Sequence, residues 1–78
     1  MQWGYSPTSG SETNVTANFP ITFNSLCYLV VAGTKIESGN PDRMSQNRSF
    51  NLSQAVFYLN NLNDYSGNIK APYIAMGI

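Results

Sequence analysis

The chain has little cysteine and no histidine. Cys27 is the only cysteine among its 78 residues, so no disulfide can form within the chain. Without histidine or a second thiol, the usual ligands of a structural zinc site are missing. The lack of histidine also excludes a Ser-His or Cys-His nucleophile pair. We therefore expect no metal and no cofactor, and we expect Cys27, which lies in an apolar run, to be a buried thiol.

Charge is scarce as well. Charged residues make up 10% of the chain, against about 25% in typical soluble domains, and four basic residues balance four acidic ones. Nucleic-acid binding requires a basic stripe that neutralises the phosphates, whereas the basic residues here are few and scattered: Lys35, Arg43, Arg48 and Lys70. The sequence therefore predicts no nucleic-acid partner. No apolar run approaches the ~20 residues of a membrane span, so we expect no membrane insertion.

The acidic side chains give little reason to expect an enzyme. Two of them could in principle form a glycosidase pair, which needs carboxyl groups about 5–9 Å apart. All four, however, lie among turn-forming residues, where carboxylates are commonly just solvated: Glu12, Glu37, Asp42 and Asp64. We predict that the protein is not an enzyme. The many uncharged amides and hydroxyls would suit hydrogen bonding to sugars, although on composition alone they are more typical of a β protein rich in turns.

The length predicts one domain, residues 1–78. A domain of this size buries only about 60% of its unfolded surface and is marginally stable alone. Since a disulfide and a zinc site are excluded, oligomerisation or unusually good packing remains. Met1 is followed by no basic or apolar leader segment. The abrupt start suggests a C-terminal domain that was excised from, or ends, a longer chain.

Short β-type runs separated by turn formers predict an all-β fold. Residues 15–21 alternate apolar and polar side chains with the period of a half-buried strand, which would bury Val15, Ala17, Phe19 and Ile21. Residues 50–62 are ambiguous, because leucines at helical spacing compete with β-favouring residues and with asparagines that disfavour helix interiors.

Two runs, residues 26–32 and 73–78, are apolar on both faces. In the first run, alternation divides the side chains between two faces: Leu26, Tyr28, Val30 and Ala32 on one, and Cys27, Leu29 and Val31 on the other. Both faces of such strands should be covered, which is difficult within a small monomer, so we expect a subunit interface. Both chain ends are thus apolar, and we expect them to be buried. Trp3 is predicted to be a core residue, with an exposed platform for a sugar as the alternative.

The polar stretch 34–49 carries five of the eight charged residues and predicts a long loop. Long ordered loops are often functional, but a plain connector would have the same composition. The sequence leaves both interpretations open.

Several motifs occur in an order that resembles one known family. Gln2, Trp3 and Gly4 open the chain, residues 15–23 read VTANFPITF, Cys27 lies in the next apolar run, and residues 73–78 read YIAMGI. This order, with residues 50–59 as a middle strand, resembles the C-terminal domain of bacteriophage and prophage tail-fibre proteins. Tyr73 stands where the family usually has tryptophan, and Ile78 stands where it usually has an aromatic residue. Ala17 and Asn18 are an extra pair within the usual run, and the stretch 34–49 has no counterpart.

The resemblance implies a small antiparallel β-sandwich that assembles as a homotrimer at the fibre tip. It also implies a function, attachment to the host through a bacterial surface glycan, such as lipopolysaccharide, and hence a place on the virion. Sugars are held by planar polar groups and aromatic faces, so our candidate receptor-binding residues are the polar and aromatic side chains of the predicted loops: Asn40, Asp42, Arg43, Gln46, Asn47, Arg48 and Tyr65.

A second hypothesis is a purely structural role. A trimerisation domain that ends the fibre, with the receptor site elsewhere, would need only the apolar strands. The long polar stretch favours receptor binding, because a trimerisation domain has no need of it. An enzyme, such as a depolymerase, is a third and more distant alternative.

Overall fold

The computed structural model describes residues 1–39, 43–61 and 67–78, which contain eight strands and no helix. One sheet has the order β1–β8–β3, another has the order β2–β6–β5, and a ribbon pairs β4 with β7. All these pairings are antiparallel, which confirms the predicted all-β, antiparallel fold. The strands are β1 (Gln2–Tyr5), β2 (Thr13–Asn18), β3 (Cys27–Ala32), β4 (Lys35–Gly39), β5 (Arg43–Phe50), β6 (Gln54–Asn61), β7 (Gly67–Lys70) and β8 (Pro72–Gly77).

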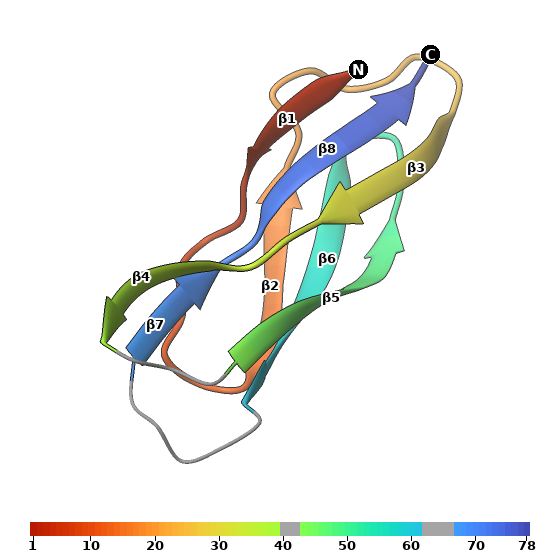
Figure 1. Ribbon diagram of the computed structural model, residues 1–78. Coiled ribbons are helices and arrows are strands. Elements are labelled where there is room, and N and C mark those ends of the chain that lie inside the picture. Colours follow the sequence, from red (N-terminus) through yellow and green to blue (C-terminus); the bar gives the residue numbers. More distant parts are fainter. Residues whose placement is uncertain (40–42, 62–66) are drawn as a thin grey trace.

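The two three-stranded sheets lie over one another as two layers (Figure 1). Short connections join β3 to β4 and β7 to β8, so the ribbon extends the first sheet at one end of the molecule. The domain is elongated, with principal extents of 41 × 17 × 14 Å. Both chain termini lie at the end opposite the ribbon (Figure 1). The structure contains a single chain, so the expected homotrimer stays a prediction.

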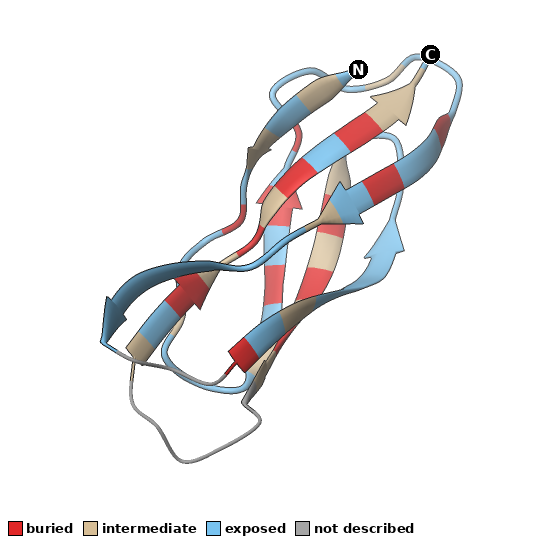
Figure 2. Cartoon of the chain, in the orientation of Figure 1, coloured by how far each residue is buried: buried red, intermediate tan, exposed pale blue. Residues whose placement is uncertain are grey.

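Buried residues alternate with exposed or half-buried ones along several strands (Figure 2), and their side chains form one hydrophobic core. Ala55, Phe57 and Leu59 of β6 are fully buried, which confirms the strand interpretation of this segment. Phe57 and Phe19 both pack against Tyr73 of the facing sheet, with ring centroids 5.8 and 5.7 Å apart. This aromatic contact joins the two layers, since such pairs add about 0.5–1.5 kcal/mol to the effect of burial.

The predicted loop at 34–49 is wrong, because the described residues of this segment form two strands. β4 pairs with β7, and β5 pairs along its length with β6. Nearly all side chains of the two strands are exposed. Their sequences therefore lack the apolar alternation of a half-buried strand. Backbone pairing and a few polar contacts hold them in place. For example, the Asn47 Nδ2 donates to the Val30 carbonyl at 3.0 Å.

A β-bulge between Cys27 and Leu29 changes which side chains of β3 face the core. The bulge inserts one extra residue, so Cys27 and Val30 are both buried and Leu29 lies outside. The expectation that Cys27 and Val30 lie on opposite faces is therefore wrong, whereas the buried thiol is confirmed. A strict period of two cannot predict such a shift.

Three apolar residues expected in the core are exposed in the single chain. Trp3 is 69%, Ile21 72% and Ile78 66% exposed. Trp3 points to the outer face of an edge strand, Ile21 follows Pro20 beyond the end of β2, and Ile78 uses its backbone to pair with Leu26. Burial of the chain ends is thus wrong for the isolated chain, and burial within an oligomer stays a prediction.

The residues of the opening motif have specific packing roles. The Gln2 side-chain amide binds the backbone of Ile21 twice: its Nε2 donates to the Ile21 carbonyl at 2.6 Å, and its Oε1 accepts from the Ile21 N–H at 2.9 Å. Gly4 lies opposite Tyr73 in the β1–β8 pair, and a Cβ at Gly4 would lie 2.8 Å from the Tyr73 hydroxyl. The motif thus closes one end of the sandwich over the aromatic core.

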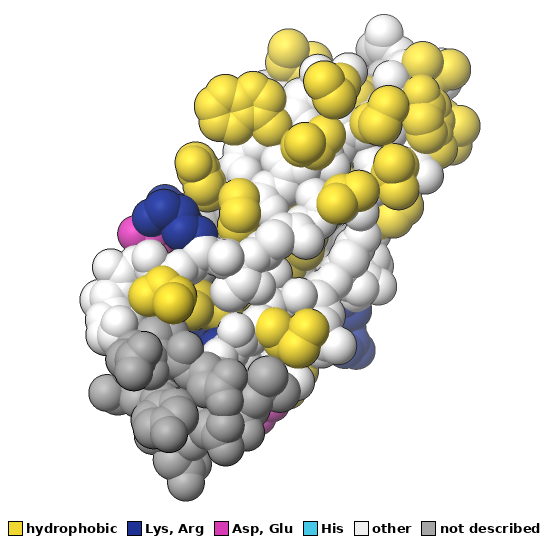
Figure 3. Space-filling model, in the orientation of Figure 1, with side chains coloured by type: hydrophobic (Ala, Val, Ile, Leu, Met, Phe, Trp, Pro, Cys, Tyr) yellow, Lys and Arg dark blue, Asp and Glu magenta, His cyan; other side chains and the backbone are white. Residues whose placement is uncertain are grey.

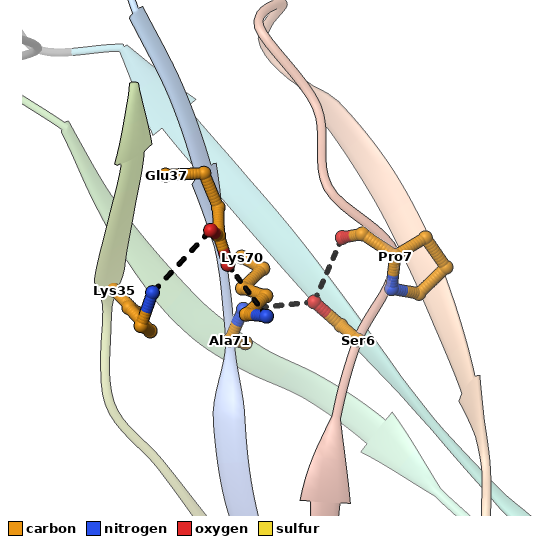
Figure 4. Close-up of polar contacts among 6 residues, drawn as sticks. All are labelled: Ser6, Pro7, Lys35, Glu37, Lys70 and Ala71. Carbon is orange, nitrogen blue, oxygen red and sulfur yellow. Dashed lines mark hydrogen bonds and ion pairs between the residues drawn. The ribbon is translucent and has the colours of Figure 1, made fainter. Parts of the chain in front are cut away.

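Glu37 ties the ribbon together (Figure 4). Its carboxylate pairs with Lys70 of β7 at 2.5 Å and with Lys35 of its own strand at 3.3 Å. These contacts lower the pKa of Glu37, the hydrogen bond from Lys70 most of all. The Lys70 Nζ also lies 4.1 Å from the centre of the Tyr5 ring, a cation–π contact that connects the ribbon to β1.

Candidate functional site

The outer face of the first sheet is apolar. Trp3, Ile74 and Val31 lie side by side on β1, β8 and β3, and they are 69%, 45% and 56% exposed. Figure 3 shows that apolar side chains gather over these three strands. We call this surface the apolar face and define it by the exposed residues Met1, Trp3, Tyr5, Leu29, Val31 and Ile74.

The apolar face is hollowed at its centre. An open depression of about 490 Å³ lies between β1, β8 and β3, and Gly4, Gly33 and Pro72 form part of its lining together with members of the apolar face. Large exposed apolar patches are uncommon on monomeric proteins and mark interaction sites. The chemistry of the depression is hydrophobic contact, because few polar groups line it.

The outer face of the second sheet is mostly polar and carries an aromatic ring. We call it the polar face and define it by residues Asn14, Thr16, Asn18, Gln46, Val56 and Tyr58. The register places Asn14 of β2 and Gln46 of β5 on either side of Tyr58 of β6. The two amides are exposed and Tyr58 is half-buried. The nearby Glu12 carboxylate, through a hydrogen bond with the hydroxyl, raises the pKa of the Tyr58 phenol, and Arg48 acts weakly in the opposite direction.

The candidate receptor-binding residues are spread over different environments. Gln46 and Arg48 are exposed on β5. Asn47 is exposed as well, but its amide is bonded to the first sheet. Three other candidates lie outside the described residues: Asn40, Asp42 and Tyr65. The structure therefore brings Gln46 and Arg48 to the polar face beside Tyr58, and it places these two on a strand rather than in the predicted loop.

Arg43 differs from the other candidates because it is buried, with only 8% of its surface exposed. Its Nη1 donates to the Ser9 carbonyl at 2.7 Å, and its Nη2 donates to the Ser11 carbonyl at 2.6 Å. Longer bonds reach the carbonyls of Leu59, Asn60 and Gly67. A guanidinium that is enclosed by backbone carbonyls joins the turn at residues 6–12 to β5 and β6, and it is not presented to a receptor.

Tyr58 and Asn14 were missed as site residues. The runs that contain Val31 and Ile74 were expected to form an interface and an exposed Trp3 was the stated alternative, but their alignment in one row was not predicted. The alternation of Ala55, Phe57 and Leu59 with Tyr58 would have assigned Tyr58 to the outer face if residues 50–62 had been assigned as a strand. The partners across the sheet depend on register, which one sequence does not reveal.

The described part of the chain shows no group of three or more metal-binding side chains. Within the same residues, no helix is long and apolar enough to cross a membrane.

Comparison with known families gives one match. A family model described as "Putative tail fiber protein gp53-like, C-terminal" matches residues 1–78. No match was found among curated proteins or among solved structures.

Proposed function

Because the chain belongs to the family of gp53-like tail-fibre C-terminal domains, we propose that it forms the receptor-binding tip of a phage tail fibre and assembles as a homotrimer through its apolar face. Membership of this family makes the protein a component of a phage virion. The observation that carries the proposal is the contrast between the two outer faces. One is apolar and the other is polar and almost uncharged.

The apolar face supports self-association. Removing one large apolar side chain from water contributes about 1.5–3 kcal/mol, and each copy offers at least three such side chains in one row, those of Trp3, Val31 and Ile74. Cyclic assembly turns the same surface of every copy toward the common axis. It would also stabilise a domain too small to be robust alone.

The polar face supports receptor binding. If the apolar faces meet at the axis, the outer faces of the β2–β6–β5 sheets point away from it and stay accessible. Each copy then contributes one weak site for a surface glycan such as lipopolysaccharide, and three linked sites bind far more tightly than one.

Molar mass in solution tests the assembly. One copy has a mass of 8.6 kDa, so we expect light scattering during gel filtration to give about three times this mass, and we expect Val31→Lys to yield monomer. Thr16→Lys, an exposed change on the other sheet, is the matched control and should stay trimeric. A monomeric wild type at micromolar concentration, or a trimeric Val31→Lys variant, would contradict the proposal.

The second candidate function is purely structural trimerisation. The apolar face favours it, because self-association through this face requires no receptor. Pull-down with cells of strains that the parent phage infects separates the two. Trimers that bind these cells support receptor binding, whereas trimers that do not bind them support the purely structural role.

A further inference from the structure

A row of three side chains crosses the polar face at its centre. Asn14, Tyr58 and Gln46 occupy neighbouring positions on β2, β6 and β5, and we call them the Tyr58 row. We infer that the Tyr58 row is the glycan-binding site of this domain and that it binds an uncharged sugar. This inference rests on the proposed function and assigns residues and a ligand class to it.

The row is suited to a flat ligand by its geometry. Neighbouring strands are about 4.8 Å apart, so the three side chains extend over roughly 10 Å across the sheet, which is the scale of a short oligosaccharide. Phe57 and Leu59, on either side of Tyr58 in the chain, are fully buried, so the Tyr58 ring lies on the outer surface. Its backbone is fixed on the central strand of the sheet.

Each group in the row has a function in sugar binding. A tyrosine ring offers a rigid, amphipathic contact surface at low cost in conformational entropy. A carboxamide both donates and accepts hydrogen bonds, so Asn14 and Gln46 can bind vicinal hydroxyl groups on either side of the ring. The Tyr58 hydroxyl lies near Glu12, which raises the pKa of the phenol, so this group stays protonated and can donate a hydrogen bond to a ligand or accept one from it.

The charges around the row favour an uncharged ligand. Among the described residues, Glu12 and Arg48 are the charged side chains that act on the Tyr58 hydroxyl, one of each sign. An acidic polysaccharide would be repelled by Glu12 and would meet Arg48 alone as a cation, whereas acidic motifs are commonly bound by clusters of arginines. The two charges cancel, and the adjacent positions on the same face carry only uncharged residues: Thr16, Asn60, Val56 and Met44.

An array of purified bacterial polysaccharides, both neutral and acidic, tests the site with the assembled protein. We expect wild type to bind neutral polysaccharides and Tyr58→Ala to lose at least tenfold in affinity. Asn18→Ala is the matched control, because it changes an exposed side chain on the same face, four residues along β2 from Asn14. Its affinity should stay within twofold of wild type.

The design remains informative if Tyr58→Ala fails to fold. Asn14→Ala combined with Gln46→Ala removes two exposed amides, and we expect circular dichroism to show a native fold with at least tenfold weaker binding. Wild-type binding that neither variant weakens would overturn this site but leave the proposed function standing. Binding restricted to acidic polysaccharides would overturn the ligand class. Failure of the wild type to bind any polysaccharide would count against the proposed function itself, and therefore also against the site.

Discussion

Replacement of Arg43 by alanine should destabilise the domain severely. The guanidinium forms two short, charge-assisted hydrogen bonds, to the carbonyls of Ser9 and Ser11. Hydrogen bonds of this kind contribute about 1.5–3 kcal/mol each. The sum of the two gives roughly 3–6 kcal/mol, and rehydration of the freed carbonyls will reduce this loss, so we expect about 3–5 kcal/mol.

That loss is large for so small a protein. At roughly 0.05–0.15 kcal/mol per residue, a chain of 78 residues has a free energy of unfolding of about 4–12 kcal/mol. Arg43→Ala should therefore leave a substantial unfolded fraction, or unfold the domain entirely. Arg43→Lys keeps the charge but lacks the forked geometry that reaches two carbonyls, so it should lose an intermediate amount.

Urea denaturation followed by circular dichroism measures the effect, at one fixed protein concentration because assembly would contribute to stability. Arg48→Ala is the matched control, since Arg48 lies on the same strand with an exposed side chain and should change stability by at most about 0.5 kcal/mol. Equal unfolding free energies for the two variants would refute the argument that Arg43 organises the adjoining turn.

Three further changes test other contacts. Gly77→Ala should destabilise strongly, because a Cβ there would collide with the Leu26 carbonyl and lie 2.8 Å from the Phe23 ring; a thermal midpoint unchanged from wild type would contradict this. Burial raises the pKa of Tyr73, so the stability that its neutral phenol contributes is complete below pH ~10 and falls as pH rises toward the folded-state pKa. Tyr73→Phe should therefore flatten the alkaline limb of a stability–pH curve. An unaltered limb would count against this explanation. The pKa of Glu37 is lowered, so the stability that this carboxylate contributes is present above its ordinary pKa near 4.3 and is lost as pH falls through the folded-state pKa. Glu37→Gln should therefore reduce the acid-induced loss of stability between pH 5 and pH 2. Identical acid titrations of the two proteins would be evidence against the ion pairs.

The sequence predicts the all-β class and part of the core because burial requires alternation. Val15, Ala17 and Phe19 are buried as their spacing indicates, and strand β6 agrees with its β-favouring residues. Residues 34–49 do not follow this rule, because β4 and β5 are held mainly by backbone pairing and have little apolar surface to alternate.

The candidate site is less accessible to prediction from sequence. Arg43 and Arg48 have the same chemistry in the sequence, and only the structure shows that one is enclosed by carbonyls and the other exposed. The Tyr58 row depends on strand register, which brings together residues from three separate segments. Likewise, the bulge at Cys27 rearranges β3 without any proline or glycine to signal it.

The neighbouring chain termini have a practical consequence for engineering. Gln2 is paired with Ala75 on adjacent strands, and both termini lie at one end of the molecule (Figure 1). A short linker from Ile78 to Met1 would therefore make a circular permutant whose strands keep their present pairing. Likewise, a fluorophore or affinity tag attached to either terminus would lie at that end, away from the β4–β7 ribbon.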